Sequence, residues 1–142
     1  FWTACAAVQN GNPLYWDDKL AAELTNGPTA PLTLLSAWFR PHYWMPGRYT
    51  IALPWQTHFD LKSTLALPEA VATDSEVVFG APIRPGDRIS CVETLRSLSD
   101  VKSTKLGVGR FWVIDAVCRN QRGEWVGTET ITGFGYRGHS AS

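Results

Sequence analysis

The sequence predicts an α+β domain in which one buried helix packs against an antiparallel β-sheet. The stretch "LTLLSAWF", residues 32–39, is apolar on nearly all sides, as expected of a helix inside a molecule. In the second half of the chain, β-rich runs alternate with polar turns. The 142 residues, 44% of them hydrophobic, suffice for one domain with a core but not for two. We therefore expect a single domain over residues 1–138 and a disordered tail over 139–142.

Short helices separated by turn signals are expected at the N-terminus. Residues 1–8 end an apolar helix, and Pro13 suits the first turn of the next helical segment. Asp17 and Asp18 favour the start of a helix over 19–24, because negative charge interacts favourably with the positive end of the helix dipole.

The buried helix over 32–39 is bounded by two prolines. Pro31 is placed to start this helix and Pro41 to end it. The segment 40–73 has no clean periodicity and predicts loops with one or two short elements.

Four strands are expected after this segment, at 75–80, 88–99, 109–120 and 124–136. The sequence "NQRG", 120–123, suits the hairpin between the last two strands. Side chains alternate between faces along a strand, so Thr128, Thr130 and Thr132 should share one face. We expect Glu76 and Glu129 on exposed strand faces.

Charge and hydropathy give no support to nucleic acid or membrane as a partner. Thirteen basic and thirteen acidic residues give a formal net charge of zero. No apolar run approaches the ~20 residues that cross a bilayer. We therefore predict neither a nucleic-acid nor a membrane partner.

The three cysteines, Cys5, Cys91 and Cys118, are far apart in the sequence and form no CxxC pair. Metal binding or a disulfide is open, but buried reduced thiols are favoured. Reduced thiols in turn predict a cytoplasmic protein. No metal site is predicted.

Two further pairs of polar residues carry groups that could take part in chemistry. His58 precedes Asp60 by two residues, and the pair could exchange protons, although an ordinary, partly exposed histidine is favoured. Asp87 and Arg88, in the turn "RPGD", are expected to fix that turn and its neighbouring strand rather than to contact a substrate.

Three segments in the same order resemble the N-terminal-type domain of the MaoC-like hydratase family. They are "NPLYWDDKLAAE" (12–23), "GPTAPLTLLSAW" (27–38) and "APIRPGDRIS" (81–90), and the similarity runs over roughly residues 1–136. The resemblance implies the hot-dog fold, in which an antiparallel β-sheet wraps around a central α-helix. It also implies hydration of 2-enoyl-CoA thioesters without a cofactor other than the coenzyme A of the substrate.

The family's two proton-transfer residues are both replaced in this chain. An aspartate and, five residues later, a histidine carry the chemistry, and backbone N–H groups near the start of the central helix hold the enolate oxygen. The aspartate position is Asn10 and the histidine position is Tyr15. An amide does not titrate near neutral pH, and a phenol has a pKa of about 10. We therefore predict no catalytic residue in this chain.

The predicted substrate-binding residues are the retained Asn12 and the lead into the central helix, Pro31, Leu32 and Thr33.

The resemblance thus predicts a non-catalytic subunit of a heteromeric enoyl-CoA hydratase, a lyase that acts in lipid metabolism. A catalytic MaoC-like subunit would complete the heterodimer or heterotetramer, and this chain would shape the tunnel for a bulky acyl group, as in steroid side-chain degradation. Because the chain lacks an initial methionine and ends just after the domain, we expect it to be a piece of a longer protein. An OB-like domain would follow and would contact an aldolase.

Two other functions compete with this prediction. The alternative is an acyl-CoA-binding or scaffolding hot-dog module with no hydratase role. A hot-dog thioesterase is disfavoured, because its acidic residue should lie on or beside the central helix, where residues 32–39 offer only Thr33 and Ser36.

Overall fold

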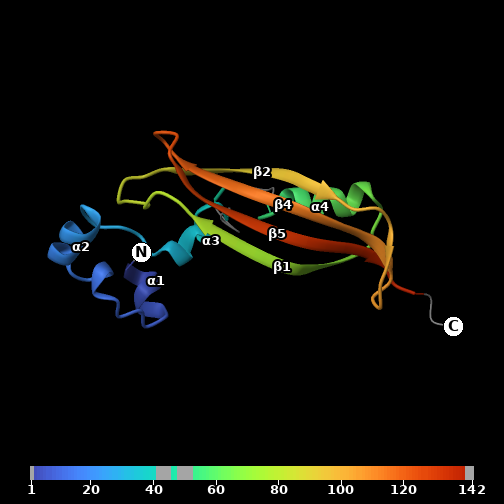
Figure 1. The fold of residues 1–142 in the computed structure, drawn as a ribbon, viewed down its shortest axis with the longest axis horizontal. Coiled ribbons are helices and arrows are strands. Elements are labelled where there is room, and N and C mark those ends of the chain that lie inside the picture. The colour runs from blue at the N-terminus through green and yellow to red at the C-terminus, as the bar shows by residue number, and fades with distance from the viewer. Residues whose placement is uncertain (1, 41–45, 48–52, 140–142) are drawn as a thin grey trace.

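The computed structural model describes residues 2–40, 46–47 and 53–139 (Figure 1). A long antiparallel sheet forms the body of the molecule. Short helices formed by the N-terminal part of the chain lie beyond one end of the sheet, and others lie against one face of the sheet. The helical segments are α1 (Trp2–Ala7), η1 (Pro13–Tyr15), α2 (Asp18–Thr25), η2 (Leu32–Leu34), α3 (Leu35–Trp38) and α4 (Gln56–Thr64). The strands are β1 (Glu69–Phe79), β2 (Ile89–Leu98), β3 (Lys102–Ser103), β4 (Val108–Asn120) and β5 (Trp125–Arg137).

The sheet order is β1-β5-β4-β2, with the short β3 paired to β4, and all pairs are antiparallel. The hairpin between β4 and β5 turns at residues 121–124, as the sequence predicts. The strand predicted over 75–80 begins earlier, at Glu69. Strand β1 forms one edge of the described sheet, and β2 together with the short β3 forms the other.

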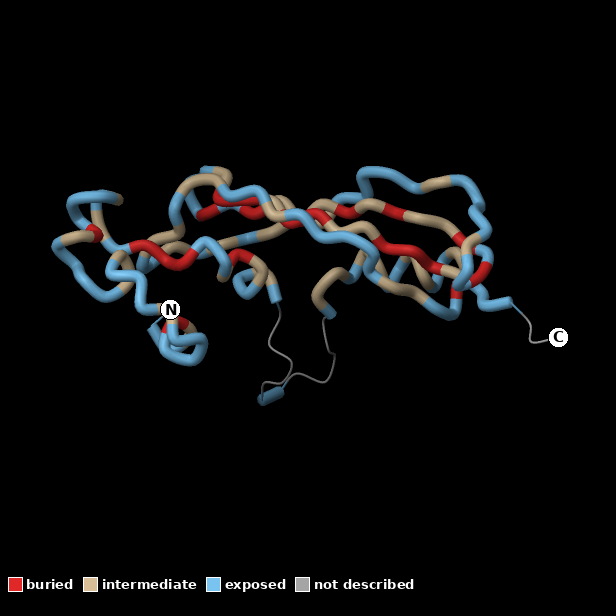
Figure 2. The backbone as a smooth tube through the Cα atoms, turned by 60° about the horizontal axis from the view of Figure 1, so that its bottom comes forward, coloured by how far each residue is buried: buried red, intermediate tan, exposed pale blue. Residues whose placement is uncertain are grey.

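The inner face of the sheet, defined here as the face covered by α3 and α4, holds the core (Figure 2). Leu35 of α3 packs against Cys118, whereas Leu61 of α4 packs around Trp112 and Ile114. Alternate residues of β4 point to this face and are fully buried: Trp112, Ile114, Ala116 and Cys118. This alternation follows from the extended backbone, in which successive side chains point to opposite faces.

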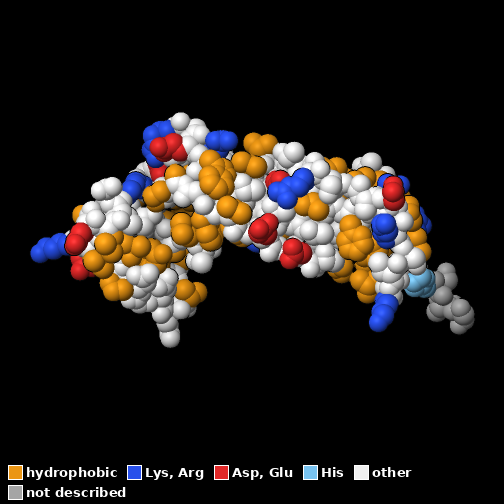
Figure 3. Space-filling view, in the orientation of Figure 1, with side chains coloured by type: hydrophobic (Ala, Val, Ile, Leu, Met, Phe, Trp, Pro, Cys, Tyr) orange, Lys and Arg blue, Asp and Glu red, His pale blue; other side chains and the backbone are white. Residues whose placement is uncertain are grey.

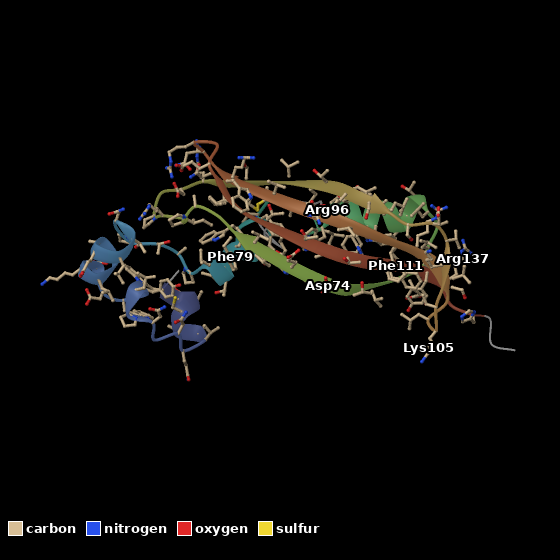
Figure 4. The ribbon with its side chains drawn as sticks, viewed as in Figure 1. Asp74, Phe79, Arg96, Lys105, Phe111 and Arg137 are labelled. Carbon is tan, nitrogen blue, oxygen red and sulfur yellow. A yellow bond between two sulfur atoms is a disulfide. The ribbon has the colours of Figure 1, made fainter. Side chains whose placement is uncertain are left out.

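The outer face of the sheet, turned toward the reader in Figure 3, carries no helix in the part of the chain that the structure describes. Arg96 forms an ion pair of 2.7 Å with Asp115, which also accepts a hydrogen bond of 2.7 Å from Thr130 (Figure 4). Phe111 stacks on Phe134 with ring centroids 4.4 Å apart. By the register, Thr128 and Thr132 share this face with Thr130, as predicted.

The N-terminal helices begin where local signals place them. The Asp17 carboxylate accepts hydrogen bonds from the N–H groups of Lys19 (2.9 Å) and Leu20 (3.2 Å) and so caps α2. At its other end, α2 stops at Asn26 in the left-handed conformation. The Arg84 guanidinium donates to the backbone carbonyls of Thr25 and Gly27 and holds this helix end against the turn before β2.

The predicted central helix is shorter and less buried than expected. Residues 32–34 form a 3₁₀ turn, and α3 adds a single α-helical turn. Leu35 is buried, but Leu32 remains 45% exposed and Trp38 39% exposed. A one-turn helix can direct only part of its surface to the sheet, and α4 packs over another part of the inner face, around Trp112 and Ile114. Pro41, the predicted stop, lies outside the described residues.

The prediction of reduced thiols is wrong for two of the three cysteines. Cys91 of β2 and Cys118 of β4 are direct partners in the antiparallel register, with Cα atoms 4.1 Å apart, and form a disulfide. Cys5 is a free, buried thiol. The two bonded residues are 27 positions apart, so only the pairing of the strands brings them together. The cytoplasmic location, which was inferred from reduced thiols, remains a prediction.

The predicted exposed position of Glu129 is also wrong, whereas Glu76 is exposed as expected. Glu129 lies on the inner face, between Val77 of β1 and Ala116 of β4 in the register, and is 6% exposed. Its Oε2 is buried and has no hydrogen-bond partner. Polarity suggested the surface, but the strand register places this side chain in the core.

Candidate functional site

The loop "QNGNPLY" is held in shape by its own amide side chains. The Asn10 side chain accepts a hydrogen bond from the N–H of Asn12 (3.1 Å), and its backbone carbonyl accepts one from the Trp16 indole (2.7 Å). Asn12 caps η1 by accepting a hydrogen bond from the N–H of Leu14 (3.0 Å), just before Pro13 at the first helical position. Both amides therefore brace the loop, and neither supplies a group that titrates near neutral pH.

Tyr15 ends η1 and is half-buried. Its backbone carbonyl accepts a hydrogen bond of 2.9 Å from the indole of Trp2, which joins the loop to α1. This contact fixes the backbone position of Tyr15, which the sequence resemblance places at the histidine position of the MaoC-like family.

A cavity of about 360 Å³ lies between α1 and the start of η2. It brings together three residues singled out from the sequence: Asn10, Pro31 and Thr33. The remaining lining residues are mostly aliphatic: Ala4, Cys5, Ala7, Val8 and Leu34. The structure thus forms an apolar cleft with one amide and one hydroxyl.

The other sequence-predicted site residues lie outside this lining. Asn12 and Leu32 are exposed, and Tyr15 is not among the residues that form the cavity wall. The backbone N–H groups in the first turn of a helix have no acceptor within that helix. The N–H of Thr33, in the first turn of η2, is one of them. A substrate role for Asn12, Pro31, Leu32 and Thr33 stays a prediction.

Asp87 fixes the turn before β2, as the sequence predicts. Its carboxylate accepts hydrogen bonds from the N–H of Arg84 (2.9 Å), from the Gln121 amide (3.2 Å) and from the Arg122 guanidinium (2.9 Å). The Arg84 N–H, more than Arg122 and Gln121, holds the pKa of Asp87 below its ordinary value. Asp87 therefore joins this turn to the β4–β5 hairpin, and its described contacts have a structural role.

His58 and Asp60 do not form the conceivable proton-transfer pair. The Asp60 carboxylate accepts a hydrogen bond of 2.8 Å from the Gln56 amide. His58 instead accepts a hydrogen bond of 3.1 Å at Nδ1 from the indole N–H of Trp112. Burial, and secondarily the charge of Lys62, lowers the pKa of His58. The favoured prediction of an ordinary histidine missed the Trp112 contact, because the two residues are 54 positions apart.

Within residues 2–40, 46–47 and 53–139, no group of three or more His, Cys, Asp or Glu side chains gathers as metal ligands would. No helix among them is long and apolar enough to cross a membrane. Of the predicted tail, residues 140–142 lie outside the described residues. The Nε2 atom of His139 lies 3.0 Å from the carbonyl oxygen of Thr104.

The sequence from residue 5 to residue 129 matches the model of the FAS1-like dehydratase domain region. The chain belongs to this family. A relative of this FAS1-like dehydratase domain from Thermomonospora curvata, described as a probable enoyl-CoA hydratase alpha subunit, is 36% identical over 131 residues. The alignment includes 87% of the present chain but only 39% of the relative's length.

Solved structures confirm the hot-dog fold of the FAS1-like dehydratase domain. The ChsH1-ChsH2 complex from Mycobacterium tuberculosis matches with a TM-score of 0.77 at 23% identity, covering 98% of this chain and 77% of that one. A MaoC-like dehydratase from Rhodospirillum rubrum matches with a TM-score of 0.60 at 21% identity, over 93% and 80% of the two chains. The predicted family and fold are both confirmed, although the helix that the sheet faces is short.

Proposed function

We propose that this chain is a non-catalytic subunit of a heteromeric 2-enoyl-CoA hydratase. The observation that carries the proposal is the pair Asn10 and Tyr15, which stand where the family has its aspartate and histidine. Asn10 braces its own loop and cannot act as a base near neutral pH. The partner, a MaoC-like subunit with an intact aspartate and histidine, would perform both proton transfers.

An exposed sheet edge supports a partner subunit. Strand β1 pairs with β5 on one side only, and the described residues offer no strand for its other side. Most of its eleven residues are exposed. Long unpaired edges are readily joined by a strand from another chain. The similarity to the alpha subunit of a probable enoyl-CoA hydratase supports the same proposal.

For the substrate, we propose a bulky 2-enoyl-CoA, such as one from steroid side-chain degradation. The apolar cleft beside Asn10 would add room for the acyl group, because no proton-transfer pair occupies it. Because the chain spans only 39% of its relative, the activity of the whole protein and an aldolase contact through a further domain are proposals as well.

The test is to purify the chain alone and together with a candidate MaoC-like partner, and to follow hydration of a 2-enoyl-CoA. We expect activity only in the complex. Asn10→Ala or Tyr15→Ala in the complex should leave turnover within a few-fold, whereas loss of the partner's aspartate or histidine should reduce it by about 10²–10⁴-fold. Strong hydration by the isolated chain would refute the proposal.

A binding measurement separates this function from the alternative. Amide hydrogen exchange in β1 should slow when the partner is added, if the edge pairs with it. If the chain instead binds acyl-CoA alone and gives no active complex with any MaoC-like partner, the acyl-CoA-binding or scaffolding role is the better description.

A further inference from the structure

A second apolar cavity, which we call the α4 cavity, lies between the N-terminal part of α4 and the inner face of β1 and β5. Its volume is about 380 Å³, a size that suits a small-molecule site. It is lined by Leu53, Pro54, Trp55, His58, Phe59, Ala72 and Ile131. It shares no lining residue with the cavity beside Asn10, so an inference from it does not depend on the proposed function.

His58 is the one ionisable residue in this lining, since every other side chain there is aliphatic or aromatic. The imidazole ring is held on two sides, with centroids 5.2 Å from the Trp112 ring and 5.3 Å from the Phe59 ring, both edge to face. The α4 cavity therefore contains a polar group whose orientation is fixed by its neighbours.

The hydrogen bond to Trp112 determines which nitrogen of His58 carries the proton. An indole N–H can only donate, so Nδ1 of His58 must be the acceptor and carries no hydrogen. The neutral ring therefore has its hydrogen on Nε2. Trp112 cannot easily turn away, because it is fully buried and its Nε1 lies over Gly133, where a Cβ would be only 2.3 Å away.

His58 thus offers the α4 cavity a neutral hydrogen-bond donor. No hydrogen bond from a residue in the described ranges engages Nε2. Burial favours the neutral form of the ring and lowers its pKa. Besides the indole of Trp55, the lining is apolar, and the imidazole N–H of His58 is held in a fixed orientation, an arrangement that can orient an apolar ligand through one polar atom.

We propose that the α4 cavity binds a bulky apolar molecule that carries one neutral hydrogen-bond acceptor, such as a ketone oxygen, and that His58 Nε2–H donates to that oxygen. A carboxylate would lose its hydration for a single hydrogen bond, which is strongly unfavourable in an apolar cavity. An ammonium group would meet a donor and find no anionic partner among the lining side chains.

Two probes of equal shape test the proposal on the intact chain: 2-adamantanone, and 2-methyleneadamantane, in which a CH₂ group replaces the ketone oxygen. Binding would be followed by NMR, with the methyl signals of Ile131 and the ring signals of His58 as reporters. We expect the ketone to bind about three- to tenfold more tightly, the ratio that one neutral hydrogen bond gives. Two-bond ¹H–¹⁵N spectra of the imidazole should show the Nε2–H tautomer.

Variants of His58 provide the matched controls. His58→Phe should abolish the preference for the ketone while the hydrocarbon probe still binds. His58→Gln, which keeps an N–H donor, should retain part of the preference.

Equal affinity for the two probes, no response at Ile131 and His58, or an Nδ1–H tautomer in the wild-type chain would each overturn the proposal. A ketone preference that survives in His58→Phe would do so as well. The wild-type measurements decide the question even if a variant fails to fold.

Discussion

Replacing Gly133 by alanine should destabilise the protein by displacing the indole of Trp112. The added Cβ would lie 2.3 Å from Nε1 and 2.9 Å from Cε2 of that ring. Both distances are shorter than real Cβ contacts, and the ring is rigid and fully buried. The indole must therefore shift, and its hydrogen bond to His58 must lengthen or break.

The expected loss follows from three contributions. Overpacking a filled core lowers the free energy of unfolding by about 1–3 kcal/mol. Leaving the indole N–H without its acceptor lowers it by about 1–3 kcal/mol more. Alanine restores about 0.5–1 kcal/mol relative to glycine within a strand, because it restricts the unfolded chain. The net loss is about 1–5 kcal/mol, the sum of the first two contributions less the third.

Urea unfolding of the variant and the wild-type chain measures this difference. Gly138→Ala is the matched control, since the nearest atom to its added Cβ is 4.0 Å away, and we expect a change within about 0.5 kcal/mol. The ¹H–¹⁵N spectra of His58 should also change in Gly133→Ala and not in the control. If the two variants were equally stable, the close packing of Trp112 on Gly133 would be wrong.

Three further outcomes are expected. Glu93→Ala should lower the free energy of unfolding by about 1–2 kcal/mol. The Glu93 carboxylate accepts hydrogen bonds from the N–H groups of Gln56 (3.2 Å) and Thr57 (2.8 Å) at the start of α4, and the variant loses both. Thermal unfolding of the variant measures the loss. Glu129→Met should raise it by about 1–3 kcal/mol, since it removes a buried oxygen without a donor, whereas Glu76→Met on exposed β1 should change urea stability little. The pKa of His58 in the folded protein lies below the unfolded value of 6.5. Its contribution to stability is therefore fully present above pH 6.5 and is lost as the pH falls toward the folded pKa. In urea unfolding at a series of pH values, His58→Asn should flatten that part of the stability–pH curve.

The features predicted correctly from the sequence depend on hydrogen bonds between near neighbours or on the period of a strand. Asp17 caps a helix through residues two and three positions later. The period of two along β5 places Thr128, Thr130 and Thr132 on one face before any partner strand is known.

Other features were decided only by tertiary structure, because they depend on the register between distant segments. The disulfide joins residues 27 positions apart, and the hydrogen bond from Trp112 to His58 joins residues 54 apart. The same register turns Glu129 into the core, although its polarity favours the surface. A side chain's identity fixes the chemistry that it can perform, but only the pairing of strands fixes which groups meet it and whether water reaches it.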